Sequence, residues 1–148
     1  MGVEAVQLSD LSEIRSVVAA AIRARVVDSE PDVQSLLAGV DASIHRWQLD
    51  RAQGVHLKYT VDRQIAGVAL VRNFWNLAML FVAPAYQRQG IGRALVEAAV
   101  LECKPHSVML KVNSSTFAVG FYLSLGFRQV GPGLDRPGGC VPFEYPIA

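Results

Sequence analysis

The sequence predicts an α/β fold with a mixed central sheet of six to seven strands, flanked by about four helices. Three observations lead to this prediction. Two segments with helical apolar spacing come first, strand-like segments of almost continuous apolar character occupy the middle, and a strand, helix, strand run follows them. Such a run normally means parallel pairing through a right-handed crossover. Because 148 residues can bury one sizeable core but not two, we expect a single domain over residues 1–148.

The composition is that of an ordinary globular protein. Hydrophobic residues make up 51%, charged residues 18%, and the formal net charge is +1, which gives no electrostatic footprint for nucleic acid or a membrane surface. The N-terminus lacks a secretion signal, and no apolar run is long enough to cross a bilayer. With only two cysteines, a disulfide framework is not expected. The sequence therefore predicts a soluble cytoplasmic protein with no nucleic-acid or membrane partner.

Two helices are expected in the first third of the chain. Apolar residues recur at helical spacing from Leu11 to Ala21 and again from Val33 to Trp47, on either side of the polar segment "DSEPD". Asp10 and Glu13 stand where their carboxylates can satisfy free N–H groups at the start of the first helix. Both helices should therefore cover a sheet with their apolar faces.

Three strands are expected next. The apolar period changes to two at Leu57, Tyr59 and Val61, which is typical of a half-buried strand. The segments "IAGVALV" and "WNLAMLFV" follow, and their almost continuous apolar character indicates burial on both faces. These two strands should form the centre of the sheet.

The second half of the chain predicts a crossover and the closing elements. Gly90 to Cys103 reads as a helix, and "SVMLKV" reads as the strand that follows it. The segment "SSTFAVGFYLSLG" predicts a short helix that Gly126 ends in a left-handed conformation. "FRQV" and "VPFEYPI" are candidate closing strands around the Gly/Pro-rich loop 131–139.

The segment "AYQRQGIGRALVEA", residues 85–98, places Gly90 and Gly92 between a strand and a helix. A strand that leads through glycines into a helix is a general device for binding phosphate. A P-loop is excluded because no Gly-Lys-Ser/Thr follows, and a dinucleotide motif is excluded because Leu95 stands at its third glycine. Taken alone, the two glycines are better explained by a helix that simply begins there.

Two motifs together resemble the Gcn5-related N-acetyltransferases, the GNAT family. "LFVAPAYQRQGIGRAL" is similar to the coenzyme A motif of that family, with Gln87, Gly90 and Gly92 at its defining positions. "FYLSLGF" matches the Tyr-xxx-Gly-Phe signature at the downstream distance that the family uses. The resemblance extends along essentially the whole order of elements. It implies the GNAT acyl-CoA N-acyltransferase fold and an acetyl-CoA-dependent N-acetyltransferase that acts by direct transfer on a small or peptide-borne primary amine.

The resemblance also implies which residues bind acetyl-CoA. Backbone N–H groups of Arg88 through Arg93 would bind the pyrophosphate, with glycine leaving room for the phosphates. The fourth strand would splay from the fifth at a bulge, so that pantetheine pairs with the backbone from Leu80 to Val82, and an N–H group there would stabilise the oxyanion. The expected coenzyme-binding residues are Leu80, Phe81, Val82, Gln87, Arg88, Gln89, Gly90, Ile91, Gly92, Arg93, Asn113 and Ser115. No metal is expected.

Tyr122 is the implied catalytic residue, because the family gives this position the role of protonating the departing CoA thiolate. Its spacing alone also fits a side chain packed between Ala118 and Leu125. The general base is left open. Lys111 stands where family members that acetylate protein N-termini carry Glu, which counts against that class of acceptor. Water is one candidate for the base, and the side chains of three residues are the others, namely His45, His56 and Glu144.

Two features of the acceptor side and a rival function stay open. An acidic group, formed by Asp28, Glu30 and Asp32, could attract a cationic amine or could only cap a helix. Trp47 and Trp75 could line the acceptor site or pack in the core. The rival function is a catalytically silent coenzyme A binding or sensing module. The sequence decides neither the acceptor nor whether the protein forms a homodimer.

Overall fold

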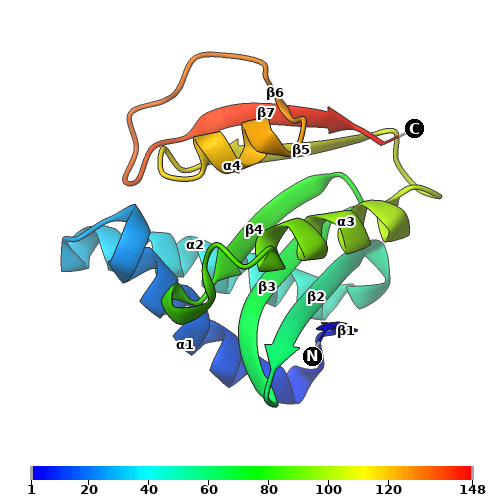
Figure 1. Cartoon of the computed structure of the whole chain (residues 1–148), viewed down its shortest axis with the longest axis horizontal. Helices are drawn as coiled ribbons and strands as arrows, with labels where there is room; N and C mark the ends of the chain where they lie inside the picture. The colour runs from blue at the N-terminus through cyan, green and yellow to red at the C-terminus, as the bar shows by residue number, and fades with distance from the viewer. Residues whose placement is uncertain (1, 148) are drawn as a thin grey trace.

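The computed structural model describes residues 2–147 and contains one seven-stranded mixed sheet in the order β1-β2-β3-β4-β5-β7-β6 (Figure 1). Neighbouring strands are antiparallel except for the parallel pair β4 and β5. The strands are β1 (Gly2–Ala5), β2 (Gly54–Val61), β3 (Gln64–Arg72), β4 (Asn76–Val82), β5 (Met109–Ser114), β6 (Arg128–Gln129) and β7 (Val141–Pro146). The α-helices are α1 (Leu11–Ala21), α2 (Glu30–Leu49), α3 (Ile91–Cys103) and α4 (Val119–Ser124).

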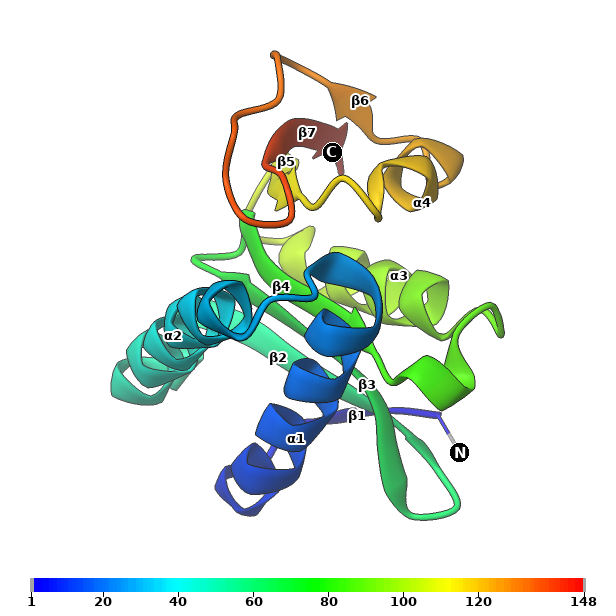
Figure 2. The ribbon, with the colours of Figure 1, turned by 90° about the vertical axis from the view of Figure 1, so that its left-hand side faces the viewer.

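The helices cover both faces of the sheet and divide the core into two clusters. Helices α1 and α2 lie on one face, and α3 lies on the other (Figure 2). The cluster beneath α1 and α2 includes Ile14, Val18 and Leu37, whereas the cluster beneath α3 and α4 includes Leu95 and Tyr122. The predicted α/β class, the mixed sheet and the parallel crossover are therefore confirmed.

Of the two carboxylates at the start of α1, Asp10 caps a free N–H group as the sequence predicts, whereas Glu13 does not. Asp10 accepts a hydrogen bond from the Gln7 N–H group at 2.8 Å and pairs with the Lys58 ammonium at 2.8 Å. Glu13 accepts from the backbone N–H group of Ile65 at 2.7 Å. The two side chains also link the start of α1 to the sheet, Asp10 through Lys58 of β2 and Glu13 through Ile65 of β3.

Strand β4 separates from β5 after a single residue pair. Opposite Leu70 and Val71 of β3 stand Met79 and Leu77, so Ala78 is the extra residue of a β-bulge. The one pair between β4 and β5 joins Asn76 to Lys111. Beyond it, the rest of β4 has no partner on that side, which is the predicted splay at a bulge.

The separation of the strands also corrects one burial prediction. Strand β3 is buried on both faces from Ile65 to Val71, as its apolar run indicates. In β4 only Leu77 and Met79 are buried, and its last three residues, Leu80, Phe81 and Val82, border the opening toward β5. Both strands therefore have an almost continuous apolar sequence, but only β3 is buried along most of its length.

Two glycines with a left-handed backbone stand at helix ends, one before α3 and one after α4. Gly90 has φ +80° at the N-cap of α3, and Gly126 has φ +94° just after α4, as the sequence predicts for a left-handed end. Helix α4 itself spans only Val119–Ser124, because residues 116–118 form turns.

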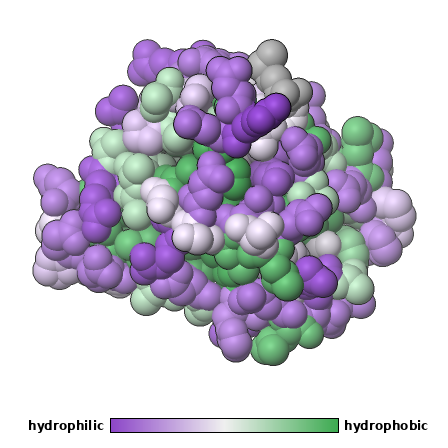
Figure 3. Space-filling model, turned by 90° about the horizontal axis from the view of Figure 1, so that it is seen from below, coloured by the Kyte–Doolittle hydropathy of each residue, from purple (hydrophilic) through white to green (hydrophobic). Residues whose placement is uncertain are grey.

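The surface combines polar and apolar residues. Figure 3 shows one face of the molecule, on which hydrophilic side chains surround a central group of hydrophobic ones. Within residues 2–147, no helix combines the length and the apolar character that a bilayer crossing requires.

Candidate functional site

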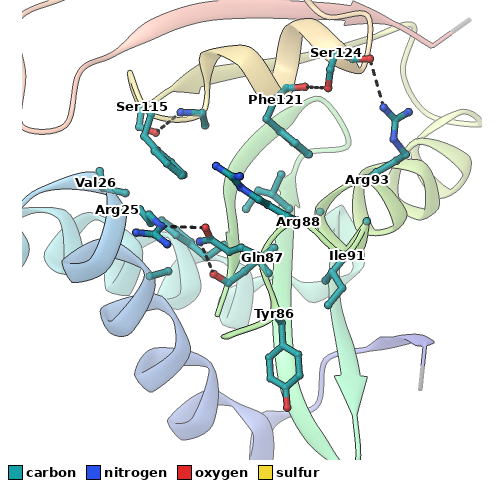
Figure 4. A pocket seen from close by; sticks show the side chains of 18 residues that line it. Arg25, Val26, Tyr86, Gln87, Arg88, Ile91, Arg93, Ser115, Phe121 and Ser124 are labelled. Atoms are coloured by element: carbon teal, nitrogen blue, oxygen red, sulfur yellow. Dashed lines mark hydrogen bonds between the residues drawn. The ribbon is translucent and has the colours of Figure 1, made fainter. Parts of the chain in front are cut away.

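A cavity of about 440 Å³ lies at the opening between β4 and β5 (Figure 4). The end of β4, the turn that leads into α3, the segment around α4 and the end of α1 form its walls. Ten of the twelve residues expected to bind the coenzyme line it: Leu80, Phe81, Val82, Gln87, Arg88, Gly90, Ile91, Gly92, Arg93 and Ser115. Residues far apart in the sequence thus meet where the motif predicts them.

The turn before α3 has the backbone of an anion-binding loop. Arg88 and Gly90 both have left-handed φ angles, +63° and +80°. A Cβ atom at Gly90 would meet no atom within 4 Å, so glycine is favoured there by the backbone conformation and not by crowding. The first N–H groups of a helix have no intrahelical acceptor, and the helix dipole makes this end positive. The cavity therefore borders a set of free donors.

Gly92 has a different structural reason from the one that the sequence suggested. A Cβ atom at this position would lie 3.1 Å from the Phe121 ring, which is closer than ordinary packing distance. Glycine therefore allows the ring on α4 to pack against the first turn of α3. The neighbour that occupies this space in the structure is Phe121.

The charged residues of the cavity wall are all arginines. Arg25, Arg88 and Arg93 line the cavity, and no Asp or Glu does so among residues 2–147. Figure 4 shows Arg88 extending into the cavity from the turn, while Tyr86 points away from it. Arg93 lies 3.9 Å from Glu97, at the limit of an ion pair. The uncompensated positive charge suits an anionic ligand.

Two expected coenzyme residues do not line the cavity. Gln89 lies in the turn, and Asn113 is an exposed residue of β5 opposite Pro142. Ser115 does line it, and its hydroxyl oxygen also accepts a hydrogen bond from the Ala118 N–H group at 3.3 Å. Of the two expected polar residues at the end of β5, Asn113 and Ser115, only Ser115 therefore borders the cavity.

Tyr122 lies next to the cavity wall but is not part of it. Its side chain is 4% exposed, and its ring packs edge-on against Phe121 and Phe127, with centroids 5.2 Å apart in each pair. Burial raises the pKa of the Tyr122 phenol above its ordinary value. The phenol is thus a protonated group held in a rigid aromatic environment.

None of the candidate bases lines the cavity. His45 is exposed on α2, and Glu144 of β7 faces Arg128 at 3.4 Å. His56 is buried in β2 against Trp47, with ring centroids 4.4 Å apart. Burial lowers the pKa of His56 to about 4, against a smaller opposing effect of Asp10. Lys111 is exposed on β5, opposite Glu144 in the register.

The acidic group before α2 has internal partners. Glu30 accepts from Arg23 at 2.8 Å, and the Asp32 N–H group donates to the Ser29 hydroxyl that caps the helix. Trp47 is buried beneath α2, whereas Trp75 is 44% exposed and does not line the cavity. The ion pair with Arg23 therefore accounts for Glu30, and core packing accounts for Trp47.

Sequence reasoning missed the contribution of α1 and much of that of α4. The lining residues that it did not predict are Ala21, Arg25, Val26, Tyr86, Phe117, Ala118, Phe121 and Ser124. A π-helical segment, Ile22–Val26, ends α1 and places Arg25 and Val26 on the cavity wall. Only the two arginines of "IRARV" before the polar break signal this site in the sequence.

Residues 34–141, most of the chain, match the acetyltransferase (GNAT) domain family. The chain belongs to the GNAT family. The resemblance read from its two motifs is thereby confirmed. Among residues 2–147, no group of three or more His, Cys, Asp and Glu side chains is arranged to hold a metal ion.

Curated relatives match part of this GNAT chain. The ribosomal protein bS18-alanine N-acetyltransferase of Salmonella typhimurium is 35% identical over 82 residues, which are 51% of this chain and 55% of that enzyme. The chain thus matches about half the length of this relative.

Solved structures extend the similarity to nearly the full length. A GCN5-related N-acetyltransferase of Rhodopseudomonas palustris has a TM-score of 0.83 at 18% identity, covering 98% of this chain and 94% of that chain. The PaiA N-acetyltransferase of Thermoplasma acidophilum, solved in complex with coenzyme A, has a TM-score of 0.77 at 20% identity and covers 99% of both chains. At these identities the two structures show a shared fold.

Proposed function

We propose that this chain is an acetyl-CoA-dependent N-acetyltransferase that transfers the acetyl group directly to a primary amine, small or peptide-borne. The observation that carries the proposal is the cavity at the splayed strands, which combines three arginines, no carboxylate and the open backbone of Gly90. These features fit the phosphates of coenzyme A, which a relative of the same fold binds.

The coenzyme-binding roles follow from the backbone of the cavity wall. The N–H groups from Arg88 to Arg93 bind the pyrophosphate at the positive end of α3. The free edge of β4 from Leu80 to Val82 pairs with the amide groups of pantetheine, as a peptide pairs with an exposed strand. An N–H group at Leu80 or Phe81 then donates to the acetyl oxygen and stabilises negative charge on it.

Tyr122 is proposed as the general acid. Burial keeps its phenol protonated at working pH, so a proton is available when the C–S bond breaks and the thiolate departs. The adjacent Phe121 lines the cavity, which supports a position of the thioester near α4. The phenol proton moves to the sulfur, and solvent returns a proton to Tyr122 after product release.

The proton of the attacking amine is proposed to leave to water. The cavity wall carries neither a carboxylate nor an imidazole among the residues that the structure describes, and Lys111 lies outside it. The acceptor therefore reacts in the fraction that is already a free amine. The bS18 relative acts on an N-terminal alanine, but Lys111 in place of the family's Glu favours another primary amine for this chain.

The test is the rate of CoA release with a panel of amines, for the wild type and for Tyr122→Phe. The substitution keeps the buried ring and removes the hydroxyl, so kcat should fall by roughly a hundredfold or more, typical of a lost general acid, while acetyl-CoA affinity stays nearly constant. Tyr145→Phe is a matched control, because Tyr145 stacks on Phe127 away from the cavity. An unchanged single-turnover rate in Tyr122→Phe would leave the tyrosine a packing role only.

The rival function is a silent coenzyme A binding or sensing module. The burial of Tyr122 outside the cavity wall favours it. The two functions separate in the same assay, because a silent module binds coenzyme A but releases no thiol with any amine, whereas the enzyme does so with at least one.

A further inference from the structure

Arg25 reaches the cavity from an element that lies outside the coenzyme motif. It belongs to the π-helical segment Ile22–Val26 at the end of α1, and such segments are frequent at functional sites. Its Nε atom donates to the Gln87 side-chain oxygen at 3.3 Å, and Gln87 in turn donates to the Val82 carbonyl at 3.2 Å. Figure 4 shows this chain of contacts along one wall of the cavity.

The guanidinium of Arg25 has no acidic partner within the part of the chain that the structure describes. Its recorded hydrogen bond is to the neutral amide of Gln87. Arg23, two residues earlier in the same segment, instead pairs with Glu30 at 2.8 Å and does not line the cavity. Since a guanidinium offers five N–H donors, most of those on Arg25 are available to a ligand.

A second cation enters the same space. Arg88 lines the cavity from the turn and likewise has no acidic partner within 4.0 Å among residues 2–147. Two like charges that border one cavity without a carboxylate repel each other until an anion lies between them. The planar fork of a guanidinium matches two phosphate oxygens at once.

We propose that Arg25 is a coenzyme ligand, which binds the pyrophosphate of acetyl-CoA from the segment at the end of α1, beside the start of the glycine turn. The position of Gln87 supports the pyrophosphate over the 3′-phosphate, because the residue that Arg25 contacts immediately precedes the turn from Arg88 to Arg93. This inference rests on the coenzyme-binding part of the proposed function and is independent of catalysis.

The experiment is a calorimetric titration of CoA into the wild-type protein, Arg25→Ala, Arg25→Lys and Arg23→Ala. Loss of one charge-assisted contact should weaken CoA binding about tenfold in Arg25→Ala. Arg25→Lys should recover part of the loss, because it restores the charge without the fork. Arg23→Ala should bind like the wild type, since it removes a neighbouring charge of the same segment that faces Glu30 instead. Arg25 and Arg23 are both exposed, so equal melting temperatures of the unliganded proteins verify the fold.

Two further arms identify the anion. Dephospho-CoA keeps the pyrophosphate and lacks the 3′-phosphate, so Arg25→Ala should weaken its binding by the same factor. Raising the salt concentration should weaken CoA binding less in Arg25→Ala than in the wild type, because one charge fewer is screened.

Several outcomes would overturn the inference. Equal CoA affinities of the wild type and Arg25→Ala would do so, as would a loss seen with CoA but not with dephospho-CoA. A change confined to the KM of the amine would assign Arg25 to the acceptor instead. If the wild type itself bound no CoA, the proposed function would fail together with this inference, whereas the other outcomes leave that function standing.

Discussion

Charged side chains inside and outside the cavity differ in whether they have an acidic partner. On the coenzyme side, Arg25 and Arg88 line the cavity without an acidic partner among residues 2–147. Outside that cavity some charges are matched by ion pairs within the protein, as in Arg23–Glu30 and Arg128–Glu144. The first region is incomplete without an external anion, whereas the second is already satisfied.

This difference explains why one region reveals its ligand and the other does not. Free cations and free N–H groups at a helix start specify a phosphate by their chemistry. Paired surface charges contribute little energy and specify no partner. The cavity therefore indicates an anionic ligand such as a phosphate, while the acceptor has to be found by assay.

The largest expected effect is the loss of CoA binding when the turn into α3 is changed. Gly92→Glu places a side chain against the Phe121 ring and adds a negative charge beside the cavity, so CoA binding should fall below detection. The measurement is the increase in melting temperature on adding acetyl-CoA, which a ligand of the native state must produce.

Gly39→Glu is the matched control for this change. A Cβ atom at Gly39, on the exposed side of α2, would meet no atom within 4 Å. Gly39→Glu introduces the same charge, and its melting temperature should still rise fully when acetyl-CoA is added. A Gly92→Glu protein that folds and still responds to acetyl-CoA like the wild type would show that the turn is only a helix start.

The turn that leads into α3 could be predicted from the sequence for a physical reason. Gly90 needs a left-handed backbone, and the motif around it is local in sequence, so its geometry follows from neighbouring residues. Arg25 could not be found this way, because its place depends on a π-helical end of α1 and on a hydrogen bond to Gln87, 62 residues away.

The missed features of the fold also depend on distant contacts. Gly2–Ala5 forms strand β1 by pairing with the edge of β2, a strand that the sequence did not predict. Glu13 was interpreted as a cap, yet its acceptor role depends on the Ile65 N–H group of β3. A single domain over residues 1–148, a cytoplasmic location and a homodimer remain predictions.

The next largest expected effect is on the pH dependence of stability, and it concerns a buried group away from the cavity. Both ring nitrogens of His56 are buried without a hydrogen-bond partner among residues 2–147. Burial lowers the pKa of His56 to about 4, so the folded protein favours the neutral ring. The unfolded chain takes up this proton near pH 6.5, and the folded state only near pH 4. Stability is therefore present above about pH 6.5 and is lost as the pH falls toward 4, by up to about 3 kcal/mol.

Urea denaturation at pH 7 and pH 4.5 measures this loss. His56→Leu should flatten the dependence, because it removes the titrating ring and its unpaired nitrogens. His45→Leu, at an exposed position of α2, should behave like the wild type. If His56→Leu loses as much stability as the wild type between these pH values, another group controls the acid sensitivity.

The smallest expected effect concerns Lys111, an exposed residue of β5. If water takes the amine proton, activity should rise with pH until the acceptor is deprotonated, and Lys111→Ala should leave the shape of this profile unchanged, because a protonated lysine cannot accept a proton. Two amines of different pKa separate the contributions, since an inflection of the substrate moves with the amine. An inflection that stays fixed and disappears in Lys111→Ala would make this lysine the base.

The most direct test of the central claim is a map of where CoA protects the backbone. Amide hydrogen exchange should be measured by mass spectrometry for the wild-type protein with and without saturating CoA. The account predicts slower exchange in peptides that cover residues 80–93, the edge of β4 and the turn into α3, and little change in β1 and the outer half of α2. Protection confined to other elements, or none at saturation, would contradict the claim that this arginine-lined cavity is the coenzyme site.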